Sequence, residues 1–283
     1  DMYRILSGNE TGLIGYWKLD EGEGTTAFDS SRSGKHGIIY DAVWDITPTV
    51  DESKYLTLKM RDYSESPDCL RFNGVSDYVR IPNSPALQVQ NTFTIEGWVK
   101  FNSQSDIRGI FAKKNGATWV SVNYGFVQRY KSRISFVVSP GGNQAKVIST
   151  GEIIKDNTWY HIAGVFDNGT MRLYVNGELI VEDTTSYLPA TDADLYLGEK
   201  WGQNYFDGYI KDVRIWDIAR TQDDIQRDMY RELGGKEFGL VGYWKLDEHL
   251  DGVAKDYTDN GNDGVIHGAK WDYSYSSLLL QEK

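Results

Sequence analysis

The stretch that decides the fold reads WYHIAGVFDNGTMRLYVNGELIV and covers residues 159–181. Apolar residues alternate with other residues along three short runs, and Asn168-Gly169 and Asn176-Gly177 separate the runs. An Asn-Gly pair between alternating runs is the strongest short signal for a β-hairpin. The stretch therefore predicts a three-stranded antiparallel meander.

Short runs of the same kind, broken by turn residues, extend outward from the meander over about residues 55–218. This spacing is typical of a sandwich or a barrel. Residues 92–101 predict one long strand, and residues 71–81 predict a hairpin that turns at Asn73-Gly74. An N-cap threonine, early acids and an apolar i, i+4 pair predict one short helix over residues 221–230. The expected fold class is all-β with a single short helix.

Composition narrows the classes of function. The chain has 283 residues, of which 40% are hydrophobic, so it can bury a sizeable core. Its net charge of −11 argues against nucleic acid and against anionic membrane surfaces as partners, because both attract clustered Lys and Arg. No apolar run is long enough to span a bilayer, so no membrane insertion is expected. The single cysteine, Cys69, excludes an intrachain disulfide.

An internal repeat organises the chain. Residues 1–45 align without a gap to residues 228–272, and about half of the positions are identical, including a shared GYWKLDE. The offset is either the period of a tandem array of domains or a duplication within one domain. We favour the array, which predicts a sandwich domain over residues 1–227. Residues 228–283 would then start a second repeat, docked on the first domain or partly loose, in a fragment of a longer polypeptide.

Several short motifs stand in a fixed order along the chain. They are YWKLDEG at 16–22, DSS at 29–31 with Gly34 and Gly37, FNG at 72–74 with DYV at 77–79, FTIEGWV at 93–99, WYHIA at 159–163, LYVNG at 173–177 and VRIWDIART at 213–221. Together they resemble the bacterial laminin-G-like family with a concanavalin A-like jelly roll. The resemblance implies two packed antiparallel sheets in a jelly-roll β-sandwich. It also implies a secreted or cell-surface protein that binds carbohydrate or serves in adhesion.

Catalytic signatures are missing from the sequence. Jelly-roll glycosidases carry Glu-x-Asp-x-x-Glu on one strand, since retaining hydrolysis needs two carboxylates about 5–5.5 Å apart. Glu96 is the only acid on its predicted strand, and no nucleophile elbow, zinc helix or P-loop occurs. His161 lies in the meander and is interpreted as a structural hydrogen-bonding residue. We therefore expect the chain not to be an enzyme.

Calcium is the one cofactor that the sequence leaves open. Relatives often hold a structural calcium ion with an Asp where this chain has Lys211, whose ammonium would instead pair with a carboxylate such as Asp20 or Glu21. Two oxygen-rich loops offer other ligands. The candidate metal ligands are Asp29 in the first loop and Asp256, Asp259 and Asp263 in the second. A solvated turn is an equally good interpretation of both loops.

Two loops carry the aromatic and amide side chains that a glycan site needs, because sugar rings stack on aromatic rings while amides bind hydroxyls. The candidate ligand-binding residues are Trp201, Gln203, Asn204 and Tyr205 in one loop, with Trp119 and Tyr124 in or near the other. The alternative for each loop is a set of aromatic residues that cap the core.

The predicted function is non-catalytic binding, as a carbohydrate-recognition or adhesion module of a tandem-repeat protein outside the cell. The expected partners are a glycan or polysaccharide, or a cell-surface protein, together with neighbouring repeats. A structural spacer or a protein-docking module without a glycan ligand is the first alternative. An accessory domain that targets an attached enzyme to polysaccharide is the second.

Overall fold

The protein forms two compact units, residues 1–59 and residues 60–283. The computed structural model describes residues 13–14, 16–17, 26–27, 29, 37–38, 68–103, 107–114, 122–129, 132–141, 144–190, 192–199, 204–248 and 252–272. Residues 240–272 supply strands to the sandwich of the second unit. The domain boundary at residue 227 stays a prediction.

The first sheet of that sandwich has eight antiparallel strands. Their order is β12-β11-β10-β5-β14-β3-β18, and β15 pairs with β14 beside β3. The strands are β3 (Cys69–Asn73), β5 (Thr92–Phe101), β10 (Trp159–Asp167), β11 (Thr170–Val175), β12 (Glu178–Thr184), β14 (Asp207–Trp216), β15 (Leu240–Trp244) and β18 (Lys270–Asp272). One short 3-10 helix, η1 (Pro85–Leu87), and one α-helix, α2 (Gln222–Asp228), accompany the sheets.

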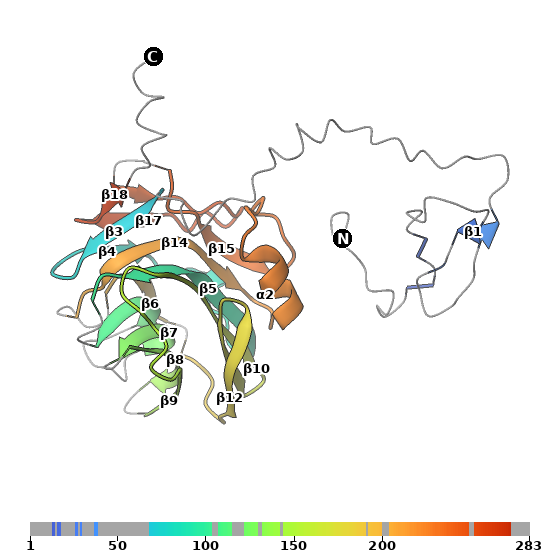
Figure 1. Ribbon diagram of the computed structural model, residues 1–283, viewed down its shortest axis with the longest axis horizontal. Coiled ribbons are helices and arrows are strands. Elements are labelled where there is room, and N and C mark those ends of the chain that lie inside the picture. The colour runs from blue at the N-terminus through green and yellow to red at the C-terminus, as the bar shows by residue number, and fades with distance from the viewer. Residues whose placement is uncertain are drawn as a thin grey trace, which may run out of the picture. The chain divides into compact units, whose positions relative to one another are not determined.

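The second sheet is also eight-stranded and antiparallel, in the order β16-β17-β4-β13-β6-β7-β8-β9. Its strands are β4 (Tyr78–Ile81), β6 (Arg108–Lys114), β7 (Val122–Arg129), β8 (Arg133–Gly141), β9 (Gln144–Ser149), β13 (Asp194–Leu197), β16 (Val253–Ala254) and β17 (Gly264–His267). The two sheets pack as the layers of a jelly-roll β-sandwich, with α2 at one side near β5 and β15 (Figure 1).

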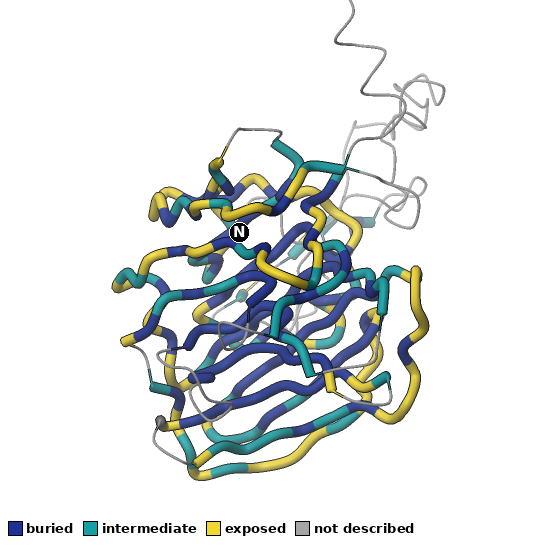
Figure 2. The backbone as a smooth tube through the Cα atoms, turned by 90° about the vertical axis from the view of Figure 1, so that its left-hand side faces the viewer, coloured by how far each residue is buried: buried dark blue, intermediate teal, exposed yellow. Residues whose placement is uncertain are grey.

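The core lies between the two sheets, where every second side chain of each strand points. Phe93 of β5 is fully buried, and its ring lies 6.2 Å from that of Phe136 in β8 and 5.4 Å from that of Phe166 in β10. Full burial of one such side chain contributes roughly 1.5–3 kcal/mol. Figure 2 shows this burial as dark strands inside the sandwich, with exposed residues gathered toward the turns.

The predicted meander is confirmed. Residues 159–181 form β10, β11 and part of β12, and the turn residues Asn168 and Asn176 have φ angles of 46° and 51°. The long strand over 92–101 is confirmed as β5, and the predicted helix as α2. The Thr221 side chain accepts a hydrogen bond from the backbone N–H of Asp224, which closes a capping box at the start of α2.

The predicted hairpin over residues 71–81 is wrong. The turn at Asn73-Gly74 exists, but it carries the chain from the first sheet to the second: β3 pairs with β14 and β18, and β4 pairs with β13 and β17. Phe72 and Val79 both point into the core, from opposite sheets. Alternation is the same in a hairpin and in two strands that face each other across a core, so the sequence pattern did not distinguish them.

Unit 1 contains a two-stranded sheet, β1 (Thr26–Ala27) with β2 (Gly37–Ile38), and an isolated bridge between Trp17 and Asp29. The corresponding residues of the repeat, 227 positions later, form β16 with β17 and a bridge between Trp244 and Asp256. The two copies of the repeat therefore share one local pairing pattern.

Candidate functional site

Four aromatic side chains gather on the outer face of the second sheet. Tyr78 of β4 lies opposite His267 of β17, and their rings are stacked with centroids 4.4 Å apart. The Tyr78 ring is also 6.1 Å from that of Tyr196 in β13 and 6.3 Å from that of Tyr205, which precedes β14. His267 is exposed and the three tyrosines are half-buried. We call these four residues the tyrosine cluster.

Strand alternation puts the tyrosine cluster on this face. Val79 and Ile81 of β4 are fully buried in the core, so Tyr78 and Arg80 point outward. In β13 the buried residues are leucines, and Tyr196 between them points outward in the same way. Three of the four rings, those of Tyr78, Tyr196 and His267, are therefore held by strands, and Tyr205 lies in the loop before β14.

Two ion pairs border the cluster. Lys114 Nζ is 3.1 Å from Glu199 Oε1, both side chains are largely buried, and the same ammonium lies 4.1 Å from the centroid of the Tyr196 ring. In the other pair, Arg80 Nε donates to Asp194 Oδ2 at 2.7 Å. Asp194 also accepts from the backbone N–H of Asn83. The face thus offers aromatic rings next to charged groups that can donate to and accept from hydroxyls.

A buried amide lies in the same sheet. Asn123 of β7 lies at a register shift between the Lys113–Tyr124 and Lys114–Val122 pairs, next to Tyr124, which points into the core. Asn123 is fully buried, and neither Oδ1 nor Nδ2 has a hydrogen-bond partner among the described residues. A buried polar group left unpaired costs about 1–3 kcal/mol. A ligand hydroxyl that reached this amide would recover that cost.

The structure describes three of the six predicted glycan residues, namely Asn204, Tyr205 and Tyr124. Tyr205 belongs to the tyrosine cluster, and the backbone carbonyl of its neighbour Asn204 accepts from the N–H of Gly109. Trp201, Gln203 and Trp119 lie outside the described residues.

Tyr124 is the one predicted glycan residue that the structure corrects. The side chain is fully buried in the core, its hydroxyl donates to the Leu87 carbonyl at 3.0 Å, and its ring lies 4.7 Å from that of Phe93. No face of this ring is open to a sugar. Tyr124 is the large apolar residue of an alternating strand, which is the alternative that the sequence left open.

Sequence reasoning missed three members of the tyrosine cluster, Tyr78, Tyr196 and His267. They are far apart in the chain, and only the pairing of β4 with β13 and β17 brings them together. A usable signal did exist, because Tyr78 and Tyr196 occupy the outward positions of short strands whose buried residues are aliphatic.

The acidic loop after β16 is a hydrogen-bonded turn. Asp256 is buried, and its two carboxylate oxygens accept from three backbone N–H groups and two side chains, those of Thr258 and Asn262. Asp263 accepts from the Asp256 N–H and from Lys255 Nζ. Asp259 is exposed, 3.8 Å from Lys236 Nζ. These contacts fix the shape of the loop.

In the N-terminal copy, Asp29 is buried and its Oδ1 accepts from the Tyr16 N–H at 2.8 Å. Within the described part of the chain, no three Asp, Glu, His or Cys side chains are arranged to hold a metal. Calcium binding stays a prediction, which equal melting temperatures in calcium and in EDTA would contradict.

Lys211 of β14 is buried, and its Nζ lies 4.6 Å from the centroid of the Trp159 ring. Its expected partners, Asp20 and Glu21, lie outside the described residues.

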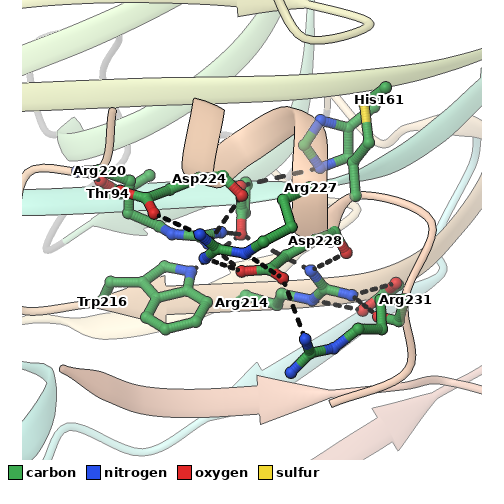
Figure 3. Close-up of polar contacts among 12 residues, drawn as sticks. Thr94, His161, Arg214, Trp216, Arg220, Asp224, Arg227, Asp228 and Arg231 are labelled. Carbon is green, nitrogen blue, oxygen red and sulfur yellow. Dashed lines mark hydrogen bonds and ion pairs between the residues drawn. The ribbon is translucent and has the colours of Figure 1, made fainter. Parts of the chain in front are cut away.

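The opposite side of the sandwich holds a network of buried charges (Figure 3). Glu96 of β5 is fully buried, and its Oε1 accepts from Arg220 Nη1 at 2.9 Å and from the Trp216 indole at 2.9 Å. Burial raises the pKa of this carboxyl, but the nearby positive charges, Arg220 foremost, outweigh burial and hold the pKa below its ordinary value. Glu96 is therefore an ion at neutral pH.

The network fastens α2 to the first sheet. Arg220 donates to the carbonyl of Asp224 and pairs with the carboxylate of Asp228, both in α2. Arg214 of β14 donates to the Asp228 and Arg231 carbonyls at 2.9 Å and 2.7 Å, and it forms a two-point ion pair with Asp212. Each buried charge faces an opposite charge, as burial requires.

His161 adjoins this network. Its Nε2 is 3.8 Å from Glu96 Oε2, and its ring meets the Trp98 indole edge to face at 5.4 Å. Burial lowers the pKa of His161 to about 4, so the ring is neutral at pH 7. A carboxylate next to a histidine can move protons in an enzyme, but both side chains are at most 1% exposed. His161 Nδ1 has no hydrogen-bond partner among the described residues, and the 3.8 Å contact with Glu96 is longer than a hydrogen bond, so the hydrogen-bonding role expected for His161 stays a prediction.

Comparisons with known proteins agree with this fold. The family model described as the concanavalin A-like lectin/glucanases superfamily matches residues 73–226. Pappalysin-1 is 24% identical in Mus musculus and 25% identical in Homo sapiens, over 180 residues. The match covers 56% of this chain and 11% of either pappalysin, so the chain spans about a tenth of the length of these relatives.

Two solved structures share the fold. A Bacteroides ovatus protein, provisionally assigned as carbohydrate binding, superposes with a TM-score of 0.58 at 21% identity over 74% of this chain and 61% of its own. The SAP-like pentraxin of Limulus polyphemus superposes with a TM-score of 0.53 at 17% identity over 74% of this chain and 96% of its own. At these identities the likeness concerns the fold. Within the described part of the chain, no helix has the length and hydropathy to cross a membrane.

Proposed function

Because the chain belongs to the concanavalin A-like lectin/glucanase superfamily, we propose that it is a non-catalytic carbohydrate-binding module of a tandem-repeat protein outside the cell. The tyrosine cluster carries this proposal. Aromatic rings bind the CH faces of sugars, and polar groups around them fix the orientation of the ligand. The provisional assignment of the Bacteroides ovatus protein supports the same class of ligand.

The outer face of the second sheet supplies each part of such a site. Tyr78 and Tyr196 present rings from neighbouring strands, so a sugar chain lying across β4 and β13 contacts both. The Lys114–Glu199 and Arg80–Asp194 pairs offer charged donors and acceptors at the border. A site spread over two strands suits a polysaccharide better than a single monosaccharide.

The non-catalytic part of the proposal rests on the buried network. Glu96 and His161, the acid and base closest to a catalytic arrangement, are buried beneath α2 and hold the fold together. Hydrolysis assays against the polysaccharides that bind should therefore show no release of reducing ends. Turnover that survives in the Glu96→Gln variant would point to another set of residues and contradict this part.

Binding is tested with the full chain on a glycan array, followed by calorimetry on the polysaccharides that bind. Removal of one stacked ring, as in Tyr78→Ala or Tyr205→Ala, should weaken binding by roughly tenfold, equivalent to about 1.4 kcal/mol. Tyr230→Ala is the control, because Tyr230 is an exposed tyrosine that lies against Trp98 of the first sheet and not in the cluster.

Equal loss of affinity in the cluster variants and in Tyr230→Ala would remove the tyrosine cluster as the site. Absence of binding to any polysaccharide, in calcium and in EDTA alike, would remove the carbohydrate function. Circular dichroism of each variant confirms that the fold is kept.

Docking between modules is the second candidate function, and the duplicated segment favours it. Carbohydrate binding and docking between modules are compatible functions, because docking would link several weak carbohydrate sites and so raise their avidity.

A further inference from the structure

The repeated segment occurs twice in this chain. The structure describes the surface of the sandwich on which its second copy packs. We call residues 13–45 the first segment and residues 240–272 the second segment. Within each, the same positions pair: Thr26 with Ile38 and Ala27 with Gly37, against Val253 with Val265 and Ala254 with Gly264. The Tyr16 N–H donates to Asp29 at 2.8 Å, and the Tyr243 N–H donates to Asp256 at 3.1 Å.

The second segment fills a defined slot on the sandwich. Its strand β15 pairs with β14, β17 pairs with β4, and β18 pairs with β3. Trp244 is fully buried in the main core, and its indole donates to the Asn262 carbonyl at 2.9 Å. The slot is thus formed by three strand edges and the core between them.

The first segment keeps the side chains that the slot requires. Trp17 and Ala27 correspond to Trp244 and Ala254, which are both fully buried in the slot. In its own unit Trp17 is 44% exposed and Ile14 is 84% exposed, whereas Val241, the counterpart of Ile14, packs against the core. Full burial of the half-exposed Trp17 side chain in such a slot would stabilise the bound state by roughly 1.5–3 kcal/mol.

The glycine shared by the two segments, Gly37 and Gly264, gives further evidence. Gly264 lies so close to β4 that a Cβ atom there would be 2.8 Å from Ile81 and from Val79, so only glycine fits. Gly37 is its counterpart, yet a Cβ atom on Gly37 would meet only Ala27, at an ordinary 3.6 Å. Glycine is therefore required at this position because of the close packing against β4 in the slot.

We propose that the first segment docks in the corresponding slot of a second copy of this sandwich and thereby joins two copies by segment exchange. The partner is a second copy whose own second segment has left the slot, because residues 240–272 fill the slot in the chain described. The proposal concerns assembly and does not depend on carbohydrate binding.

Native Cys69 gives a direct test, because it lies opposite Asp272 in the β18–β3 pair, and Asp45 is the counterpart of Asp272. Directly opposed Cα atoms in antiparallel strands are about 4.5–5.5 Å apart, within the range that a disulfide spans. Asp272→Cys in the full chain should therefore form an intrachain disulfide with Cys69 on mild oxidation. This variant verifies the register of the slot.

The exchange itself is measured between two full-length chains. The donor chain carries Asp45→Cys and Cys69→Ser, so its only thiol lies on the first segment. The acceptor keeps Cys69 and carries Trp17→Ala and Trp244→Ala, which weaken its own two segments. Because each chain has one thiol on a different side of the proposed contact, a disulfide-linked donor–acceptor dimer of twice the chain mass is the expected product.

The matched control adds Trp17→Ala to the donor and should lower the yield of the donor–acceptor dimer at least tenfold. If the acceptor does not fold, Trp244→Phe replaces Trp244→Ala. No dimer with a folded acceptor, while Asp272→Cys does form its disulfide, overturns the proposal. So does an undiminished yield with the control donor, because the cross-link would then not depend on docking of the segment.

Discussion

Glu96 is the residue on which most of the buried charge converges. Arg220 and Trp216 both donate to its Oε1, and Arg214 Nη1 lies 3.8 Å from the same oxygen. Glu96→Gln would remove one of the negative charges that face two buried guanidiniums, and would leave Arg220 with Asp228 and Arg214 with Asp212. We expect a loss of about 3–5 kcal/mol in the free energy of unfolding, the usual cost of breaking a buried ion pair. Denaturant titration measures this loss.

The control for Glu96→Gln is Glu152→Gln, which removes the same charge from an exposed pair with Arg133. Exposed pairs contribute about 0–1 kcal/mol, so this variant should unfold close to the wild type. Equal unfolding of the two variants would mean that the network around Glu96 does not hold α2 in place.

His161 makes stability depend on pH. Its pKa is about 4 in the folded protein and near 6.5 in the unfolded chain. As pH falls from 6.5 to 4, the unfolded chain binds a proton that the folded protein does not bind. The folded state therefore loses stability as pH falls through this window, by up to about 1.4 kcal/mol per pH unit. The stability that the neutral His161 ring contributes is fully present above pH 6.5.

The measurement compares unfolding of the wild type and His161→Gln between pH 4 and pH 7. Taking the difference between the two curves removes the titration of other groups. The variant should show a shallower fall in stability toward acid. Parallel curves for the wild type and His161→Gln would place the acid sensitivity elsewhere.

At the scale of elements, the turn between β11 and β12 is under two constraints at Gly177. Its φ angle is 78°, and a Cβ atom would be 2.7 Å from Gln226 Cγ. Gly177→Ala should therefore cost about 1–2 kcal/mol, from the left-handed backbone and the contact with α2. Gly151→Ala, where a Cβ atom would be 3.9 Å from Ile153, is the control and should be nearly neutral in thermal melting.

Elements with strong local signals were predictable from the sequence. β5 and the β10–β12 meander have alternation and Asn-Gly turns within single stretches, and α2 has its own cap. The failure at residues 71–81 has the opposite cause, because only pairing with distant strands decides whether neighbouring runs share a sheet. The same holds for the tyrosine cluster, of which only Tyr205 could be predicted.

Buried charges were the least predictable feature. Glu96, Arg214, Arg220 and Asp228 lie on three separate elements, and a charged residue in a sequence is ordinarily interpreted as exposed. Asp212 and Arg214 stand two positions apart in β14, and that spacing contains no information about the helix residues that they meet. The helix that covers this face supplies the rest of the network.

At the scale of the whole molecule, the strands of the first sheet in the second unit differ in how well they are buried and paired. β14 pairs with β5 on one side and with β3 and β15 on the other, whereas β12 ends the first sheet and its side chains are almost all exposed. Opening free energies in a protein follow such differences in burial. We expect amide hydrogens of β12 to exchange more than about tenfold faster than those of β14, a difference of about 1.4 kcal/mol or more.

Hydrogen exchange followed by mass spectrometry measures this difference, with β5 as an internal reference. Equal protection of β12 and β14 would show that the sheet opens as one unit. Strand β15 is informative too: slow exchange there would confirm that the C-terminal copy of the repeat belongs to the sandwich core.

The division of the chain into units depends on information that the repeat alone does not contain. The offset between the two copies was correctly recognised, but each copy can belong to the sandwich before it or to the one after it. Short connections decide the case for the second copy, because α2 ends at Asp228 and β15 begins at Leu240, next to β14.

Cys69 lies in β3, buried opposite Asp272, and burial raises the pKa of its thiol to about 12. The thiol is therefore both hidden and protonated, and the chain has no second cysteine to pair with it. The fold of this chain therefore contains no intrachain disulfide. We expect the chain to unfold at the same temperature under reducing and under oxidising conditions.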